Sequence, residues 1–352
     1  MHTESALKRW LSPLVDPKIF DFWAAHLSRT WRWERRLARV SAVTAAADGA
    51  TTLTLRWGRR APALLPGQHV NITVDVAGVR HTRAYSPTVL DARQWQITVR
   101  EQPGGCVSHF LSAPERVGST LEVSAGFGDM LLPQDQAPWL LLAAGSGITP
   151  FRSLLRAAAA ADALPPSVTL LYWADRAASL CFADEFDQLA ADHPQFRWQP
   201  LLTREGEAPA ARINAEQLAE WAPLLAGSRV YSCGPAGFVS SAEALVAGQA
   251  LQVVSEAFSL PPLQPAGEPV TITLARSGRQ LTVPGGTPLL AALEQAGERP
   301  PHGCRMGICN TCSCGKQAGT TEDLLNGALS AEPITALRLC VSSARSDLTL
   351  DL

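Results

Sequence analysis

Four cysteines near the C-terminus constrain this chain more than any other feature. Three of them follow the pattern Cys304-x4-Cys309-x2-Cys312, and Cys340 comes further along the chain. This spacing is typical of plant-type [2Fe–2S] ligands, in which one tight loop supplies three thiolates and a distant residue supplies the fourth. The pattern therefore predicts a cluster that passes single electrons.

Glycines and a fifth cysteine surround these ligands. Gly303, Gly307 and Gly315 are expected to let the loop bend closely around an inorganic core. Cys314 is expected on a strand, where we interpret it as a small packing residue.

Zinc and disulfide bonds are the alternatives for these cysteines. Zinc ribbons usually present two separate Cys-x2-Cys pairs, and this region has one. Disulfide frameworks are typical of short secreted chains, whereas this chain has 352 residues and no recognisable secretion signal. Because 8 cysteines without such a signal indicate a reducing compartment, we expect the protein in the cytoplasm.

Composition narrows the class of protein. A formal net charge of -2 gives no support for nucleic-acid binding. No segment approaches the roughly 18 apolar residues needed to cross a bilayer. With 46% hydrophobic and 18% charged residues, the chain has the composition of an ordinary globular protein, and its length predicts two or three domains.

Changes in sequence texture predict the domain boundaries. The first 34 residues are an aromatic-rich extension. Residues 35–135 carry short strands separated by Gly, Pro and Asp, which predicts an antiparallel β-barrel. Residues 136–259 alternate strands and helices, which predicts a doubly wound α/β domain. A Pro-rich linker follows at 260–268, and 269–352 form the cysteine-containing domain.

Arg83, Tyr85 and Ser86 gather at the end of one predicted barrel strand. Such a set suits a flavin, because Arg can hold a pyrophosphate, Tyr can stack on the ring and Ser can bond the ring nitrogen that accepts hydride. Further on, Gly104 and Gly105 lead into a predicted helix and could form an anion site for phosphates. A surface strand and a plain tight turn are the alternatives.

A second glycine-containing turn begins the α/β domain. Gly145 and Gly147 link a buried strand to a helix, where the backbone can approach a dinucleotide pyrophosphate. Pro150 is expected as the first helical residue. Cys233 ends a later strand and should face the same crevice, because ligands of such sheets lie outside the carboxyl ends of the strands. A buried small cysteine is the alternative.

Five ordered motifs, PGQHV, RAYS, GGCVS, GSGITP and CGP, resemble those of the ferredoxin–NADP⁺ reductase superfamily. The C-terminal module resembles plant-type ferredoxin, which implies an α+β β-grasp fold. The whole is similar to the fused reductases that serve multicomponent oxygenases and fatty-acyl desaturases. This resemblance covers about residues 35–352 and implies FAD, a nicotinamide nucleotide and a [2Fe–2S] cluster as cofactors.

The resemblance also implies a role for each matching position. Ser86, Cys233 and Glu256 would act where the flavin and the nicotinamide meet. Glu256 and Phe258 resemble a Glu-x-Phe motif beside the flavin, with linker packing as the alternative. The flavin-binding positions would be Arg83, Tyr85, Ser86, Gly104, Gly105 and Ser108. The nucleotide-binding positions would be Gly145, Gly147, Ile148, Thr149, Pro150, Cys233 and Gly234.

Cofactor choice within the family rests on two further matches. The GG-x-x-S loop resembles the FAD branch, so FAD is expected over FMN. Thr203 and Arg204 stand where NADPH-using relatives carry a Ser-Arg pair for the 2′-phosphate, and Arg176 could assist. A solvated surface arginine is the alternative, so NADPH is expected with NADH left open.

Electrons would pass from NAD(P)H through FAD and the cluster to a separate oxygenase, hydroxylase or desaturase. Arg305 and Met306 are candidates for tuning the cluster or docking that partner. The N-terminal extension could pack over the barrel or contact a membrane or membrane protein. Similar extensions occur in reductases that resemble partners of acyl-CoA desaturases. A non-catalytic electron-carrier subunit or redox sensor is the alternative function, and a monomer is expected.

Overall fold

The structure is a computed structural model. It describes residues 23, 35–58, 61–205, 212–221, 225–259 and 267–352. The predicted N-terminal extension, apart from Trp23, and the predicted linker up to residue 266 lie outside the described residues. In the described part of the chain, there is no helix with the length and apolarity that crossing a bilayer requires.

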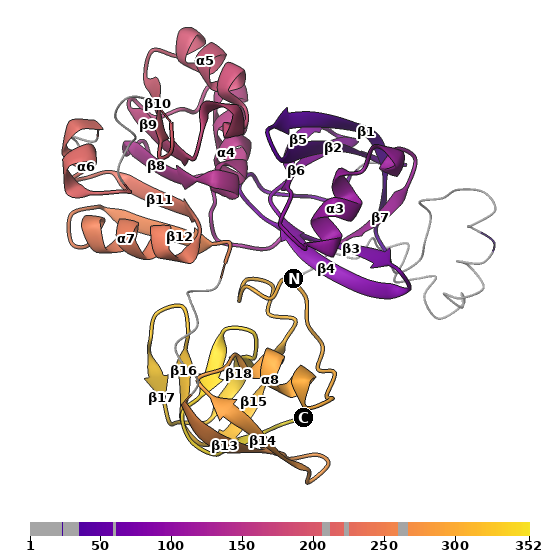
Figure 1. Ribbon diagram of the computed structural model, residues 1–352. Helices are drawn as coiled ribbons and strands as arrows, with labels where there is room; N and C mark the ends of the chain where they lie inside the picture. Colours follow the sequence, from indigo (N-terminus) through magenta and orange to yellow (C-terminus); the bar gives the residue numbers. More distant parts are fainter. Residues whose placement is uncertain (1–22, 24–34, 59–60, 206–211, 222–224, 260–266) are drawn as a thin grey trace, which may run out of the picture.

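The first folded part is a seven-stranded antiparallel sheet with the order β4-β3-β7-β1-β2-β6-β5 (Figure 1). Its strands are β1 (Leu37–Ala47), β2 (Ala50–Trp57), β3 (Val70–Val76), β4 (Val79–Tyr85), β5 (Thr88–Asp91), β6 (Gln94–Arg100) and β7 (Thr120–Val123). The helix α3 (Cys106–Ser112) and a 3-10 turn (Pro114–Arg116) lie between β6 and β7.

The burial pattern explains why this sheet encloses a core. In β6, Trp95, Ile97 and Val99 are buried between half-buried neighbours, so one face of the strand packs inward. The edge strands β4 and β5 are joined only by Ser86 and Pro87, so the sheet curls until its two edges approach each other. The predicted antiparallel barrel-like fold is confirmed, and Ser86 lies where the edges meet.

The second part is a five-stranded parallel sheet with the order β10-β9-β8-β11-β12. Its strands are β8 (Trp139–Ala144), β9 (Val168–Ala174), β10 (Phe196–Leu202), β11 (Arg229–Gly234) and β12 (Gln252–Ala257). Its helices are α4 (Ile148–Ala160), α5 (Ala183–Asp192), α6 (Ala215–Trp221) and α7 (Ala236–Val246). This order confirms the predicted doubly wound sheet, and it places the topological switch point between β8 and β11.

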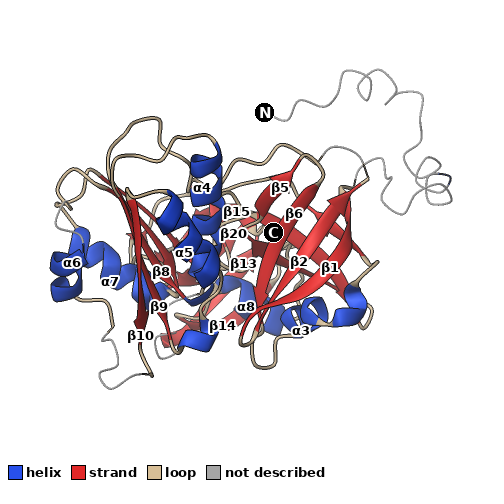
Figure 2. Ribbon diagram, turned by 90° about the horizontal axis from the view of Figure 1, so that it is seen from above, coloured by secondary structure: helices blue, strands red, loops and turns tan. Residues whose placement is uncertain are grey.

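Helices cover both faces of the parallel sheet, which explains why β9 is buried along its whole length. Leu141 and Leu170 share one core with Phe151 of α4. Leu142 shares the opposite core with Val246 of α7. Figure 2 shows α4 and α5 between this sheet and the barrel, with α6 and α7 on the outer side.

The third part combines a five-stranded sheet, ordered β14-β13-β20-β15-β18, with a three-stranded sheet, ordered β17-β16-β19. The strands are β13 (Gly267–Leu274), β14 (Gln280–Gly285), β15 (Ser313–Ala318), β16 (Thr321–Asp323), β17 (Leu329–Ser330), β18 (Ile334–Arg338), β19 (Ser342–Ala344) and β20 (Leu348–Leu350). The helix α8 (Leu289–Gln295) packs on them, and the cysteine loop runs from α8 to β15. These elements give the α+β fold expected for a ferredoxin domain.

Candidate functional site

The predicted flavin residues lie together at the barrel edge. Arg83 and Tyr85 are half-buried on β4, and Ser86 is buried directly after it. Arg83 donates to the Thr82 carbonyl oxygen at 2.8 Å, which leaves further guanidinium N–H groups for a ligand. Desolvation raises the pKa of the Tyr85 phenol, so this ring stays neutral while offering its face for stacking.

The glycine loop before α3 lies next to β4. The Sγ atom of Cys106, at the start of α3, is 3.9 Å from Nε2 of His81 on β4. The Ser108 hydroxyl closes the loop, because it accepts from the Gln102 N–H at 3.1 Å and donates to the Gly105 carbonyl at 3.0 Å. A Cβ atom at Gly105 would lie 2.6 Å from that hydroxyl, so the compact loop requires glycine. Gly104 has a positive φ of 71°.

The nucleotide loop and the end of β11 are in direct backbone contact. A 3-10 turn follows β8 and runs from Gly145 to Gly147. A Cβ atom at Gly147 would lie 2.0 Å from the Cys233 carbonyl oxygen and 2.8 Å from the Gly234 nitrogen. This packing places the turn, Cys233 and Gly234 at the switch point where doubly wound sheets bind nucleotides.

The residues after this turn belong to α4, with one difference from prediction. Helix α4 begins at Ile148, so Pro150 is its third residue and not its first. Its ring is tolerated there because the first four N–H groups of a helix have no intrahelical acceptor. Ile148 is fully buried in the core, so only its backbone can line a ligand site. Thr149 donates to the Ser146 carbonyl at 3.1 Å and holds the turn.

Cys233 and Glu256 are neighbours on adjacent parallel strands. They are paired in register between β11 and β12. The Cys233 thiol is fully buried, and burial followed by the nearby Glu256 carboxylate raises its pKa well above the usual range. A neutral thiol of this kind is a packing group of the core and is not suited to nucleophilic attack.

His69 joins the two sides of this site. Its Nδ1 atom lies 3.4 Å from the Ser86 hydroxyl oxygen, and its Nε2 atom lies 2.6 Å from Oε2 of Glu256. The contact between Nε2 of His69 and Oε2 of Glu256 does not have the angle of a regular hydrogen bond, so it is a close polar contact. The ring centroid of Phe258 lies 5.6 Å from that of His69, edge to face. Ser86, Glu256 and Phe258 therefore converge on one buried histidine.

Sequence reasoning missed His69 although it lies in the PGQHV motif. The signal is weak, because a histidine in a strand context is usually a packing residue and its partner Glu256 is distant in the chain. Nε2 of His69 and Oε2 of Glu256 are buried and have no well-aligned hydrogen bond. A bound polar group could supply the missing hydrogen bond.

A second group of predicted residues lies at the carboxyl ends of β9 and β10. Arg176 follows β9 and Arg204 follows β10, and both are exposed. The backbone brings them together, because the Arg204 N–H donates to the Asp175 carbonyl at 2.9 Å. Thr203 is bound in the same way to Ala174, at 2.9 Å. These three predicted residues therefore share one edge.

Acidic side chains that sequence reasoning missed accompany these arginines. An Oε2 atom of Glu205 accepts from the Ala177 N–H at 2.5 Å. Hydrogen bonds from the Ser179 side chain and the Arg176 backbone lower the pKa of Asp175, so it is ionised. An acidic group at this edge is typical of sites that bind an unphosphorylated ribose.

The four predicted cluster ligands form two pairs. The Cys304 thiol donates to Cys309 and lowers its pKa, and the Cys340 thiol acts in the same way on Cys312. In the described residues, no three Cys, His, Asp or Glu side chains converge on one point as a single metal ion would need. Two thiol pairs fit a diiron centre, with one pair for each iron, better than they fit zinc.

Backbone and side-chain donors already point at these sulfurs. The N–H groups of Met306 and Cys309 each lie 3.4 Å from the Cys304 sulfur. The Thr311 hydroxyl donates to the Cys309 sulfur at 3.1 Å. A Cβ atom at Gly303 would lie 2.8 Å from the Cys309 sulfur, so glycine is required beside the cluster.

Two other residues of the predicted cluster region have packing roles. Gly315 makes room for the Asp351 carboxylate and lies away from the loop bend, since a Cβ there would fall 1.9 Å from that oxygen. The expectation that it serves the loop is therefore wrong. Cys314 lies on β15 in the apolar core, where burial raises its pKa to about 12, which confirms its packing role. Arg305 is fixed by two hydrogen bonds to Glu294, of 2.9 and 2.6 Å.

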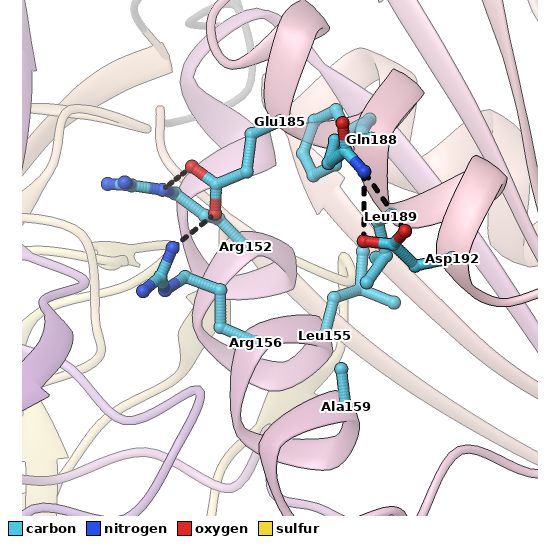
Figure 3. Close-up of a pocket in the computed structure, with 9 residues that line it drawn as sticks. Arg152, Leu155, Arg156, Ala159, Glu185, Gln188, Leu189 and Asp192 are labelled. Carbon is cyan, nitrogen blue, oxygen red and sulfur yellow. Dashed lines mark hydrogen bonds and ion pairs between the residues drawn. The ribbon is translucent and has the colours of Figure 1, made fainter.

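A groove between α4 and α5, of about 310 Å³, lies apart from all these residues (Figure 3). Its floor is apolar, and its charged groups neutralise each other. Glu185 accepts from Arg152 at 2.8 Å and from Arg156 at 3.0 Å. The groove is thus a helix–helix junction held by ion pairs.

Comparison with known proteins agrees with this geometry. Three family models match in order: an oxidoreductase FAD-binding domain at 40–131, an oxidoreductase NAD-binding domain at 141–244, and a 2Fe-2S iron-sulfur cluster binding domain at 272–344. Each match covers one of the three folded parts.

Two curated relatives match over most of their length. An NADPH oxidoreductase of Mycobacterium tuberculosis is 32% identical, over 99% of this chain and 92% of the relative. The heme-dependent oxidative N-demethylase beta subunit of Ectopseudomonas mendocina is 31% identical, over 83% of this chain and 90% of the relative. The solved structure of phthalate dioxygenase reductase is 23% identical and covers 91% of this chain and 98% of that one with a TM-score of 0.61, which shows a shared fold.

The residues present fit the cofactors of these domains. Tight packing requires glycine at Gly105 and Gly147 in the loops predicted to hold the flavin and the nucleotide, and a four-cysteine donor set lies in the third part. The chain belongs to the ferredoxin–NADP⁺ reductase superfamily, among the NAD(P)H-dependent oxidoreductases that carry FAD-binding, NAD-binding and [2Fe–2S] ferredoxin domains in one polypeptide.

Proposed function

We propose that this chain is the reductase component of a two-protein system, and that it moves electrons from NADPH to a separate oxygenase, hydroxylase or desaturase. The order of its three domains supports this role, because it places a hydride acceptor before a one-electron carrier. Relatives that function with oxygenases, including a glycine betaine monooxygenase reductase subunit at 26% identity, also support it.

The flavin residues would bind and orient FAD, which when bound accepts a hydride and releases electrons singly. Arg83 would pair with the pyrophosphate and Tyr85 would stack on the ring. Ser86 would donate to the reactive ring nitrogen. The loop residues Gly104, Gly105 and Ser108 would hold the phosphates through backbone groups.

The nucleotide residues would bring the nicotinamide against that ring. The turn with Gly145 and Gly147 would receive the pyrophosphate, with the backbone of Ile148, Thr149 and Pro150 closing it. Cys233, whose thiol is buried in the core, would line the nicotinamide site through its backbone beside Gly234. Phe258 would cover the opposite side.

A single observation carries this proposal: His69 places Ser86 of the barrel and Glu256 of the nucleotide domain at one point, next to Cys233. Residues that meet across two domains in this way are poised for transfer between two bound molecules rather than for binding one.

Anaerobic mixing of the FAD- and cluster-loaded protein with NADPH tests this function. We expect flavin bleaching, then the paramagnetic signal of a reduced [2Fe–2S] cluster, and steady reduction of cytochrome c. Ser86→Ala and Cys233→Ser should slow bleaching by about 10²-fold each without loss of FAD. Absence of bleaching in the fully loaded wild-type protein would refute the function.

The nucleotide preference is tested with the residues that follow β9 and β10. Arg176, Thr203 and Arg204 support NADPH, whereas Asp175 and Glu205 favour NADH. We expect Arg204→Ala to raise the KM for NADPH about tenfold more than the KM for NADH, since one lost phosphate contact is worth about 1.4 kcal/mol. Equal changes in both constants would remove the 2′-phosphate assignment.

We further propose the cytoplasm as the location, because all eight cysteines are free of disulfide bonds. The domains would span 35–135, 136–259 and 269–352, although β13 already begins at Gly267. A monomer and a membrane or partner contact through residues 1–34 stay predictions. The Mycobacterium tuberculosis relative matches 99% of this chain and so includes most of that extension.

A further inference from the structure

Arg338, two residues before the fourth cluster ligand, connects three separate elements of the ferredoxin domain. Its Nη1 atom donates to the Gly307 carbonyl at 2.8 Å, and its Nη2 atom donates to Oδ2 of Asp323 at 3.0 Å. The side chains of Arg338 and Asp323 are 33% and 26% exposed, so the pair is partly shielded from solvent. One guanidinium thus links the end of β18 to the ligand loop and to β16.

The contact with the loop falls on a glycine that packs against the residue after the fourth ligand. Gly307 has a φ of 78°, and a Cβ there would lie 2.9 Å from Val341, so it is closely packed against the turn between β18 and β19 that carries Cys340. The same Cβ atom would lie 3.4 Å from Nη1 of Arg338, so Gly307 is confined between the Arg338 guanidinium and Val341, the residue after Cys340. Arg338 therefore holds the part of the ligand loop that packs next to this ligand.

Hydrogen bonds to the sulfurs and nearby charges set the potential of an iron–sulfur cluster. A reduced cluster carries one more negative charge than the oxidised form, so N–H donors and cations favour reduction and anions oppose it. Arg338 and Asp323 place one charge of each sign beside the loop, and only Arg338 contacts it directly.

We propose that Arg338 is a positioning residue for the [2Fe–2S] cluster, which fixes the ligand loop at Gly307 against the turn that carries Cys340 and, balanced by Asp323, sets the potential at which the cluster accepts an electron. The inference rests on the proposed electron-transfer function. Arg305 holds the other side of the loop against Glu294, so the three-cysteine loop is fixed from two directions.

The matched control is a second ion pair of the ferredoxin domain, on the three-stranded sheet that carries Asp323, and it does not involve the ligand loop. Nε of Arg345 donates to Oε2 of Glu322 at 2.7 Å, next to β19. Arg345→Gln removes a cation from the same domain, and its partner Glu322 is adjacent in sequence to Asp323.

The test is a redox titration of the FAD- and cluster-loaded full-length protein, followed by the paramagnetic signal of the reduced cluster. We expect Arg338→Gln to lower the midpoint potential and Asp323→Asn to raise it, because these variants leave an unbalanced anion and an unbalanced cation. Arg338→Lys should lie between Arg338→Gln and wild type, since it keeps the charge but cannot bridge two acceptors in the same fork. Arg345→Gln should leave the potential unchanged.

A role confined to domain stability would shift no potential, or would shift Arg338→Gln and Asp323→Asn in the same direction, and either result would overturn the proposal. If Arg338→Gln loses iron to a chelator faster than Arg345→Gln, the positioning role of Arg338 is supported. The direction of the change in midpoint potential is then taken from Asp323→Asn. A wild-type protein without the paramagnetic signal would refute the proposed function itself, which distinguishes the two failures.

Discussion

The contact between His69 and Glu256 predicts an unusually large energetic coupling between two domains. The two atoms are 2.6 Å apart, and the side chains are 1% and 9% exposed. Removing one partner leaves the other buried and unpaired, which costs about 3–5 kcal/mol.

The perturbation is a double-mutant cycle with His69→Leu and Glu256→Leu. Each single variant should lower the temperature of thermal flavin release by roughly 6–20 °C, at about 2–4 °C per kcal/mol for a unit of this size. The double variant should recover most of that loss, because replacing a buried pair by apolar groups is often close to neutral. Flavin fluorescence and circular dichroism on the loaded protein measure the same transition.

The barrel also supplies a matched control pair. Nδ1 of His109 lies 3.5 Å from Oε2 of Glu101, and these side chains are 54% and 41% exposed. The same leucine substitutions there should change the free energy of unfolding by no more than about 1 kcal/mol. Additive losses in the buried cycle, or equal effects in both pairs, would refute the reasoning that burial makes the first contact strong.

Three further outcomes are expected. Gly147→Ala should lower the free energy of unfolding by at least about 3 kcal/mol and abolish nucleotide binding, because its Cβ would lie 2.0 Å from a backbone oxygen. The control Gly237→Ala meets no atom within 4 Å and should leave the melting temperature unchanged or higher. Iodoacetamide at pH 8 should label the exposed Cys106 in the native protein and spare Cys314, whose thiol stays neutral because burial raises its pKa to about 12; equal labelling by mass spectrometry would contradict this. Cys314→Ala should keep the iron content and Cys340→Ala should lose it, as measured by iron analysis and visible absorption.

Local patterns predicted most of the fold because each element carries its own signal. The alternation in β6 and the continuous apolar run of β9 reflect how their faces are buried, and both are readable in sequence. The cysteine spacing likewise reflects one loop. The helix start at Ile148 was misplaced because a 3-10 turn precedes it and gives no separate compositional signal.

The contacts that sequence reasoning missed all depend on tertiary packing. His69 and Glu256 belong to different domains, so neither pattern indicates the other. Glu205 is an unremarkable surface residue until the turns after β9 and β10 come together. Gly315 faces Asp351, near the C-terminal end of the chain, and only the sheet order brings these two residues side by side.

The register of Glu256 has a consequence for engineering. Its carboxylate belongs to a strand of the nucleotide domain but completes a buried contact in the barrel. A hybrid enzyme made by exchanging one of these modules with that of a homologue would inherit half of this contact, and the mismatch would be hidden in the junction rather than visible in either parent. When either module is exchanged, the residues at positions 69 and 256 should therefore be taken from the same parent.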